Sequence, residues 1–140
     1  MREAETRAYT VRRIAERANV SPHTILYYER RGLLPTARRS SKGYRLFSND
    51  SLRQIRFIKR AQALGFSLRE VKALRALGEQ ERATCPDIQE IVQAKVAEID
   101  AKMRALHEAR TQLTHLAEQC SANIPVCHCP VLQQLAECGD

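Results

Sequence analysis

Hydrophobic residues near the start of the chain recur at helical spacing and predict two short helices joined by a tight turn. The apolar face of the first helix consists of Val11, Ile14, Ala15 and Ala18. Ser21 followed by Pro22 is a strong helix start, and the second helix is expected to extend to Arg31. Two short helices in this arrangement form a helix-turn-helix, in which the second helix normally enters the DNA major groove.

The following segment predicts a small hairpin and two further helices. The basic loop 38–43 precedes a strand-like run at 44–47, and together they are typical of a wing with a basic tip. Ser48 can cap a third helix. Its buried stripe is expected to consist of Leu52, Ile55, Phe57 and Ile58. Ser67 and Glu70 form a capping box that starts a fourth helix, which extends to about Ala76.

One long helix is expected over residues 86–119, after a polar hinge. Its apolar positions are spaced by three and four residues and form a seam of Val92, Val96, Ile99, Met103, Leu106 and Leu113. One helix cannot bury such a stripe alone, so a heptad of nearly four repeats predicts a coiled coil between two chains. Packing against the chain's own basic half is the alternative, and these residues do not separate a parallel from an antiparallel dimer.

Composition and charge indicate a folded cytoplasmic protein whose two halves have different roles. Hydrophobic residues make up 44% and charged residues 28%, and no run approaches the roughly 18 apolar residues of a membrane span. Through Leu77 there are 18 Lys and Arg against 6 Asp and Glu, a net charge of +12. From Gly78 onward there are 5 against 10, a net charge of −5. The basic half is suited to neutralising phosphates.

All five cysteines lie in the acidic half. They are Cys85, Cys120, Cys127, Cys129 and Cys138. An odd number of cysteines without a secretory signal is poor support for a disulfide framework, and clustered thiols then favour metal or redox chemistry.

An ordered set of short motifs runs through the basic half. The motifs are Tyr9-Thr10-Val11, Tyr27-Tyr28-Glu29, Arg31-Gly32-Leu33-Leu34, Gly43-Tyr44-Arg45 and Ala63-Leu64-Gly65-Phe66-Ser67-Leu68. In this order they resemble the MerR family of bacterial transcription regulators. The resemblance implies a mostly α-helical homodimer that binds promoter DNA and, with its effector bound, distorts that DNA so that RNA polymerase can use both promoter elements.

The resemblance also implies a division of the chain. The expected parts are an N-terminal tail (1–8), a winged helix-turn-helix DNA-binding domain (9–77), a hinge (78–85), an antiparallel coiled-coil dimerisation helix (86–119), and a metal-binding loop with the C-terminal tail (120–140). The DNA contacts that it implies are His23, Thr24, Tyr27, Tyr28, Arg31, Lys42, Tyr44, Arg45, Arg53 and Arg56. The chain departs from the family at Leu26, where many members have an arginine.

Metal-sensing members of the family have cysteines at the positions of Cys85, Cys120 and Cys129. In an antiparallel dimer, Cys85 of one subunit would meet the other two cysteines of its partner, giving one ion per shared site. Copper(I) sensors typically have serine at the first position, so this chain resembles the divalent branch, with Hg(II), Cd(II), Pb(II) or Zn(II) as effector. Cys127 and His128 are further candidate ligands.

Three other functions are alternatives to a metal-responsive activator of heavy-metal resistance. A redox sensor of the same family with an iron–sulfur cluster would use four cysteines in one loop, and would not need Cys85. A drug-sensing regulator would need a further C-terminal domain. An enzyme is not expected, because no Cys-x-x-Cys, HExxH or paired-carboxylate motif is present.

Overall fold

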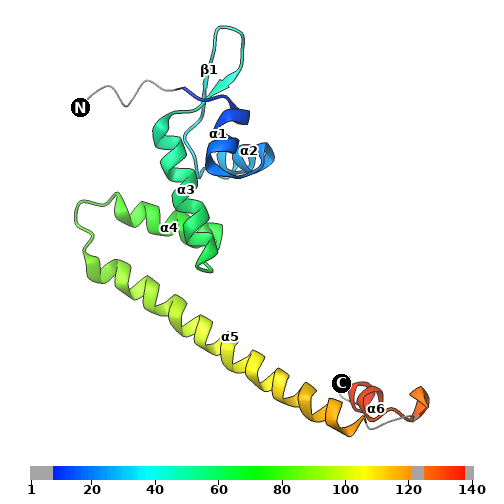
Figure 1. Cartoon of the computed structure of the whole chain (residues 1–140). Coiled ribbons are helices and arrows are strands. Elements are labelled where there is room, and N and C mark those ends of the chain that lie inside the picture. Colours follow the sequence, from blue (N-terminus) through cyan, green and yellow to red (C-terminus); the bar gives the residue numbers. More distant parts are fainter. Residues whose placement is uncertain (1–7, 121–124, 138–140) are drawn as a thin grey trace. The chain divides into compact units, whose positions relative to one another are not determined.

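The computed structural model describes residues 8–120 and 125–137 of the chain. It divides into two compact units, Met1–Ile88 and Gln89–Asp140, and we describe each by itself (Figure 1). Within the described ranges, no helix has the length and apolar character needed to cross a membrane.

The first unit begins with the expected helix-turn-helix. Helix α1 (Val11–Ala18) and helix α2 (Pro22–Arg30) are each capped by a hydroxyl, because Thr10 Oγ1 accepts from the Arg13 N–H and Ser21 Oγ accepts from the Thr24 N–H. Asn19, with a φ of 55°, ends α1 in the left-handed conformation that this residue type tolerates better than most. Pro22 occupies the first position of α2, where its missing N–H costs no hydrogen bond.

The wing is a two-stranded hairpin. Strand β1 (Arg38–Arg39) pairs antiparallel with strand β2 (Arg45–Leu46), with Arg38 opposite Leu46 and Arg39 opposite Arg45. The second strand is shorter than the predicted run 44–47. Phe47 pairs instead with Tyr9, and each backbone N–H of that pair donates to the other residue's carbonyl at 2.8 Å.

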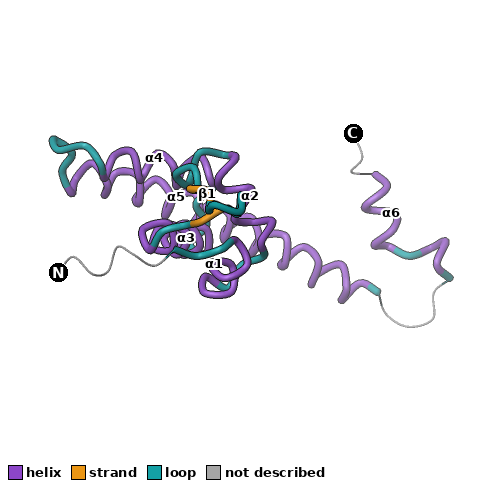
Figure 2. Tube along the Cα trace, turned by 90° about the horizontal axis from the view of Figure 1, so that it is seen from above, coloured by secondary structure: helices purple, strands orange, loops and turns teal. Residues whose placement is uncertain are grey.

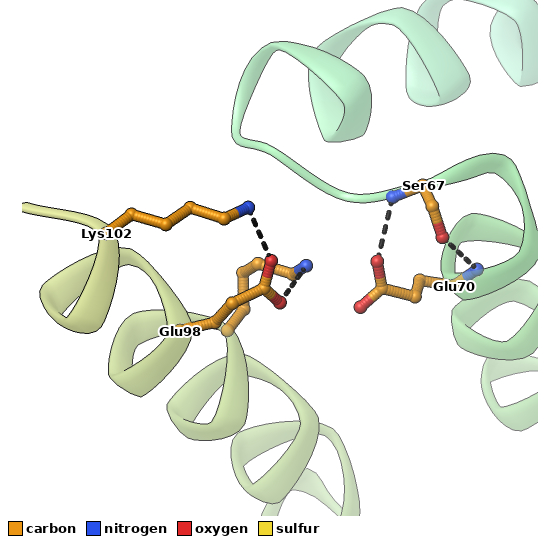
Figure 3. Close-up of polar contacts among 5 residues, drawn as sticks. Ser67, Glu70, Glu98 and Lys102 are labelled. Atoms are coloured by element: carbon orange, nitrogen blue, oxygen red, sulfur yellow. Dashed lines mark hydrogen bonds and ion pairs between the residues drawn. The ribbon is translucent and has the colours of Figure 1, made fainter. Parts of the chain in front are cut away.

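Two more helices complete the first unit. Helix α3 (Asn49–Ala63) follows the wing, and helix α4 (Leu68–Gly78) ends two residues later than its pattern predicts. The capping box at α4 is formed: the Ser67 N–H donates to Glu70 Oε1 at 2.9 Å, and the Glu70 N–H donates to Ser67 Oγ at 3.2 Å (Figure 3).

The buried stripe of α3 corrects one prediction. Leu52, Ile55 and Ile58 are buried, whereas Phe57 is 44% exposed. A step of three residues keeps a side chain on one helical face, but Phe57 is rotated by about 100° from Ile58 and faces outward.

The core of the first unit joins helices α1 to α4. Its largest fully buried side chains are Ile14, Ile25, Leu33, Ile55, Ile58 and Val71. They come from α1, α2, the turn after α2, α3 and α4. The helices of the helix-turn-helix are therefore held by a single packed core, which fixes the placement of α2 against α3 and α4.

The long helix α5 (Cys85–Gln119) begins one residue before its predicted start, at the end of the first unit. Its 35 residues correspond to a length of about 50 Å. The second unit continues with a 3-10 turn, η2 (Val126–His128), and ends in helix α6 (Pro130–Glu137). Figure 2 shows α5 and α6 as two separate helices.

Candidate functional site

The exposed face of α2 carries most of the residues expected to read DNA. His23 is exposed and Thr24 is half-buried, with its hydroxyl 2.8 Å from Ser21 Oγ. The two adjacent tyrosines differ: Tyr27 is 40% exposed and Tyr28 only 4%. The Tyr28 hydroxyl donates to Gln62 Oε1 at 2.9 Å, and burial raises the pKa of this phenol. Tyr28 therefore joins α2 to α3, and Tyr27 is the one that faces outward.

Two neighbours of these tyrosines complete the surface of α2. Leu26 is half-buried, so the residue that replaces the family's arginine contributes to packing. Arg31, just beyond the helix, places its guanidinium carbon 5.8 Å from the centre of the Tyr27 ring, within the range of a cation–π contact.

The wing holds its basic residues in two different ways. Lys42 and Tyr44 are exposed at the tip. Arg45 is instead engaged, because its Nε lies 3.1 Å from Glu29 Oε1. The Glu29 side chain is 11% exposed, and its other oxygen accepts from the Ala37 N–H at 3.1 Å. Glu29 thus connects the end of α2 to the hairpin, and Arg45 is one of the groups that position the wing.

Helix α3 contributes both predicted arginines and one lysine that sequence reasoning missed. Arg53 and Arg56 are exposed. Lys59, three residues after Arg56, donates from Nζ to the Ala18 and Asn19 carbonyls at 3.0 and 2.9 Å. These carbonyls lie at the C-terminus of α1, where a cation is favourable. The three-residue spacing of Arg56 and Lys59 places them on one helical face, but it does not identify what Lys59 contacts.

The thiols of Cys120 and Cys129 are brought together in the second unit. Their Sγ atoms lie 3.7 Å apart, at the start of α6. The backbone N–H groups of Leu132 and Val131, in the first turn of α6, lower the pKa of Cys129. The hydrogen bond with Cys129 raises the pKa of Cys120. The helix N-terminus therefore favours a negative charge on this pair.

The other candidate ligands lie apart from this pair or outside the described residues. Cys127 Sγ is 3.2 Å from His128 Nδ1, and both residues are exposed on η2. Cys85 is exposed at the first residue of α5, at the opposite end of that helix from Cys120. Cys138 falls outside the described ranges. Within those ranges, no three potential metal ligands of one chain gather at a single point.

The donor set of Cys120 and Cys129 fits a thiophilic ion. Two thiolates that bind one tetrahedral Zn(II) at about 2.3 Å lie roughly 3.8 Å apart. The observed 3.7 Å is close to this separation. The pair supplies two soft ligands without rearrangement, and further ligands are needed to complete a three-coordinate or four-coordinate site.

The seam of α5 is exposed in the single chain. Its exposed fractions range from 38% for Ile99 to 70% for Leu106. The residues concerned are Val92, Val96, Ile99, Met103, Leu106 and Leu113. On the same helix, Glu98 accepts from Lys95 and Lys102 at 2.7 Å each (Figure 3), and these bonds lower the pKa of its carboxyl group.

Comparison with known proteins decides the family. Residues 9–77 match the model of the MerR HTH family regulatory protein, and residues 52–116 match the model named MerR, DNA binding. The mercuric resistance operon regulatory protein of Bacillus cereus is 34% identical over 127 residues, which cover 91% of this chain and 96% of that protein. The chain belongs to the MerR family.

Solved structures of MerR family regulators share the fold. The transcription regulator PbrR691 from Ralstonia metallidurans CH34, solved in complex with lead(II), has a TM-score of 0.79 and 27% identity, over 89% of this chain and 97% of that chain. MerR from Bacillus megaterium MB1, in complex with mercury(II), has a TM-score of 0.68 and 32% identity, over 87% and 94%. These proteins are transcription regulators, so membership of the family confirms a DNA-binding regulator and not an enzyme.

Proposed function

We propose that this MerR family regulator responds to a thiophilic divalent metal ion, Hg(II), Cd(II), Pb(II) or Zn(II). The observation that carries the proposal is the 3.7 Å separation of Cys120 Sγ and Cys129 Sγ at the N-terminus of α6. Thiolate ligands select soft and borderline ions over Mg(II) or Ca(II). The regulators from Bacillus megaterium and Ralstonia metallidurans, solved with mercury(II) and lead(II), support the same class of effector.

The third ligand is Cys85 of the partner subunit. Cys85 and Cys120 of one chain are separated by the whole of α5, about 50 Å, and a continuous helix cannot bring its own ends together. In an antiparallel dimer each end of α5 lies beside the opposite end of its partner. Cys120 and Cys129 of one chain would then share an ion with the partner subunit's Cys85, giving two equivalent sites per dimer.

A homodimer held by α5 is supported by its uncovered apolar seam. Leu106 and Met103 are 70% and 63% exposed in the single chain, which is unfavourable for large apolar side chains in water. Residues spaced alternately by three and four interlock with the same residues of a second helix. The dimer also spaces two reading helices for two half-sites of a promoter.

The positions of the proposed ligands in the chain explain how metal binding would regulate transcription. When bound, the ion supplies a Lewis-acidic centre that holds thiolates of two chains together. Cys85 is the first residue of α5 and lies at the end of the first unit, which contains the DNA-binding helices. Fixing Cys85 against the partner biases the angle between the two DNA-binding units, and thus the shape of the promoter between them. Deforming duplex DNA costs on the order of several kcal/mol, so the bound ion has to favour one arrangement of the dimer by a comparable free energy to change access by RNA polymerase.

The test is transcription from the cognate promoter across buffered Hg, Cd, Pb, Zn and Cu concentrations, with purified protein and RNA polymerase. We expect induction by one or more divalent ions and none by Cu(I). The Cys85→Ser variant should lose induction while still binding the operator in the apo form. Induction by Cu(I) alone, or full divalent induction of Cys85→Ser, would contradict the proposal. Absorption bands of an iron–sulfur cluster in the purified protein would instead favour the redox alternative.

A further inference from the structure

A cavity of about 330 Å³ lies between the C-terminal end of α2 and the first two turns of α4. Two of its lining residues are apolar, Leu33 and Leu68. The rest of its lining consists of four cations, Arg30, Arg31, Arg69 and Lys72. No carboxylate lines it, although the two helices that form it contain glutamates at positions 29 and 70.

Within the described part of the chain, the side chains of these four cations lack the ion pairs and hydrogen bonds that several other cations of the first unit form. Arg12 and Arg45 form ion pairs with glutamates, and Lys59 donates to the carbonyls that end α1. Within residues 8–120 and 125–137, none of the four cavity cations forms an ion pair or a hydrogen bond through its side chain. The Arg31 guanidinium lies near the Tyr27 ring, an uncharged partner. Four like charges therefore surround one cavity that no carboxylate lines.

The end of α2 helps to hold these charges in place. The last carbonyls of a helix carry a partial negative charge, which stabilises nearby cations. The Lys72 ammonium lies close to this end, next to Gly32. A Cβ atom placed on Gly32 would be 3.4 Å from Lys72 Nζ. The end of α2 therefore offsets part of the repulsion among the four cations, and their positive potential remains available to an anion.

We propose that this cavity binds a backbone phosphate of the duplex DNA. Guanidinium groups match phosphate oxygens in geometry, and three of the four cations are arginines. A phosphodiester also presents the apolar edge of a deoxyribose, which suits the half-buried side chain of Leu68, behind which Leu33 belongs to the core. The cavity lies at the end of the reading helix, about 12 Å from His23 along the α2 axis, so a duplex held by that helix has phosphates in reach.

This site adds a contact from α4 to those of α2 and the wing. Arg69 and Lys72 belong to the helix that leads toward α5, whereas the other proposed contacts lie on α2, the wing and α3. A phosphate bound here would therefore link the DNA backbone to the segment that connects the two units of the chain.

The test combines protein variants with DNA in which single phosphates are replaced by neutral methylphosphonates. In the full-length protein, Arg69→Gln/Lys72→Gln removes two charges and keeps good helix formers at exposed positions. We expect weaker binding to operator and non-operator DNA alike. The slope of the logarithm of the dissociation constant against the logarithm of the salt concentration should become shallower. The expected change is about one unit for each phosphate that a half-site no longer binds. One methylphosphonate position should weaken wild-type binding but have no further effect on the double variant.

Matched variants keep the test decisive if the double variant folds poorly. Arg82→Gln removes one charge from the exposed segment after α4, outside the cavity, and should leave the salt dependence nearly unchanged. Lys72→Arg should retain wild-type binding, because its charge is kept. The proposal is overturned if no methylphosphonate position couples to the double variant. Two NMR results would also overturn it when no methylphosphonate position couples to the double variant. In the first, free inorganic phosphate shifts the Arg69 and Lys72 amide resonances. In the second, these resonances shift only when a second copy of the chain is added.

Discussion

The Arg45 guanidinium lies 3.1 Å from the Glu29 carboxylate and so joins the wing to the end of the reading helix. The same carboxylate accepts the Ala37 N–H, one residue before β1 begins. One side chain therefore anchors both ends of the hairpin. The pair is partly exposed, so its direct contribution to stability is modest, and its main effect is on the position of the wing.

Replacing Arg45 with Ala should weaken DNA binding about equally for all sequences. The change removes a cation expected to lie near the DNA backbone, and it releases the wing from Glu29. Neither effect depends on base identity. The measurement is the dissociation constant for operator and non-operator duplexes over a range of salt. A shallower salt dependence is expected, by about one unit per half-site. Loss of operator binding alone would show that Arg45 reads bases.

Leu106→Asp should convert the dimer to monomers. An aspartate in the seam would place a carboxylate in a desolvated stripe, at a cost on the order of several kcal/mol. Sedimentation should show monomers and operator binding should fall sharply. Ala105→Asp, one residue away and outside the seam, is the matched control and should stay dimeric. A dimeric Leu106→Asp protein would mean that chains associate through another surface.

The first turn of α5 should loosen at acid pH. The Asp87 carboxylate accepts from the Thr84 backbone N–H and from Thr84 Oγ1, at 2.6 and 2.8 Å, and these bonds hold its pKa below the usual value. A lowered pKa in the folded state means that the stabilisation is present above the usual carboxyl range and is lost as pH falls through the lowered value. Amide exchange of Thr84 and Asp87, followed by NMR and corrected for the intrinsic exchange rate at each pH, should show falling protection as pH falls through that interval.

Asp87→Asn provides the control for this titration. It keeps an acceptor oxygen but has no charge, so exchange at the start of α5 should lose that pH dependence. An unchanged pH profile in Asp87→Asn would assign the effect to a different group.

Cys127→Ser and Cys129→Ser should separate the two thiol environments of the second unit. Cys129 is 3.7 Å from Cys120, whereas Cys127 contacts His128. We titrate both variants with Cd(II) or Hg(II) and follow the thiolate-to-metal absorption. Cys129→Ser should lose most of this absorption, whereas Cys127→Ser should keep the part that saturates at the lowest metal concentrations. Equal losses in the two variants would place Cys127 in the same site as a fourth ligand.

Sequence patterns predict the helices well because each has a local signal. Ser21-Pro22 starts α2 and the Ser67–Glu70 capping box starts α4, and both caps are formed. A basic loop next to a strand-like run predicts the wing, and the structure confirms it. Such signals depend on residues a few positions apart, which is why they can be read from the chain itself.

Pairings between distant residues cannot be read in this way. The bonds from Lys59 to the end of α1 and from Tyr28 to Gln62 join positions more than 30 residues apart. The prediction for Phe57 is wrong because it follows the apolar character of the side chain, although the spacing from Ile55 and Ile58 does not fit one face. The proximity of Cys120 and Cys129 depends on where α5 ends and α6 begins, and local spacing alone leaves several arrangements open.

Mixed dimers can show whether one metal ion is shared between two chains. A Cys85→Ser chain is mixed with a Cys120→Ser/Cys129→Ser chain, and high-affinity binding of Hg(II) or Cd(II) is titrated. Neither homodimer has a complete three-thiolate site. The heterodimer regains one, because the first chain supplies Cys120 and Cys129 and the second supplies Cys85. We predict one high-affinity ion per heterodimer. A heterodimer that binds none, beside a wild-type chain that binds metal as a monomer, would rule out a site shared between the chains.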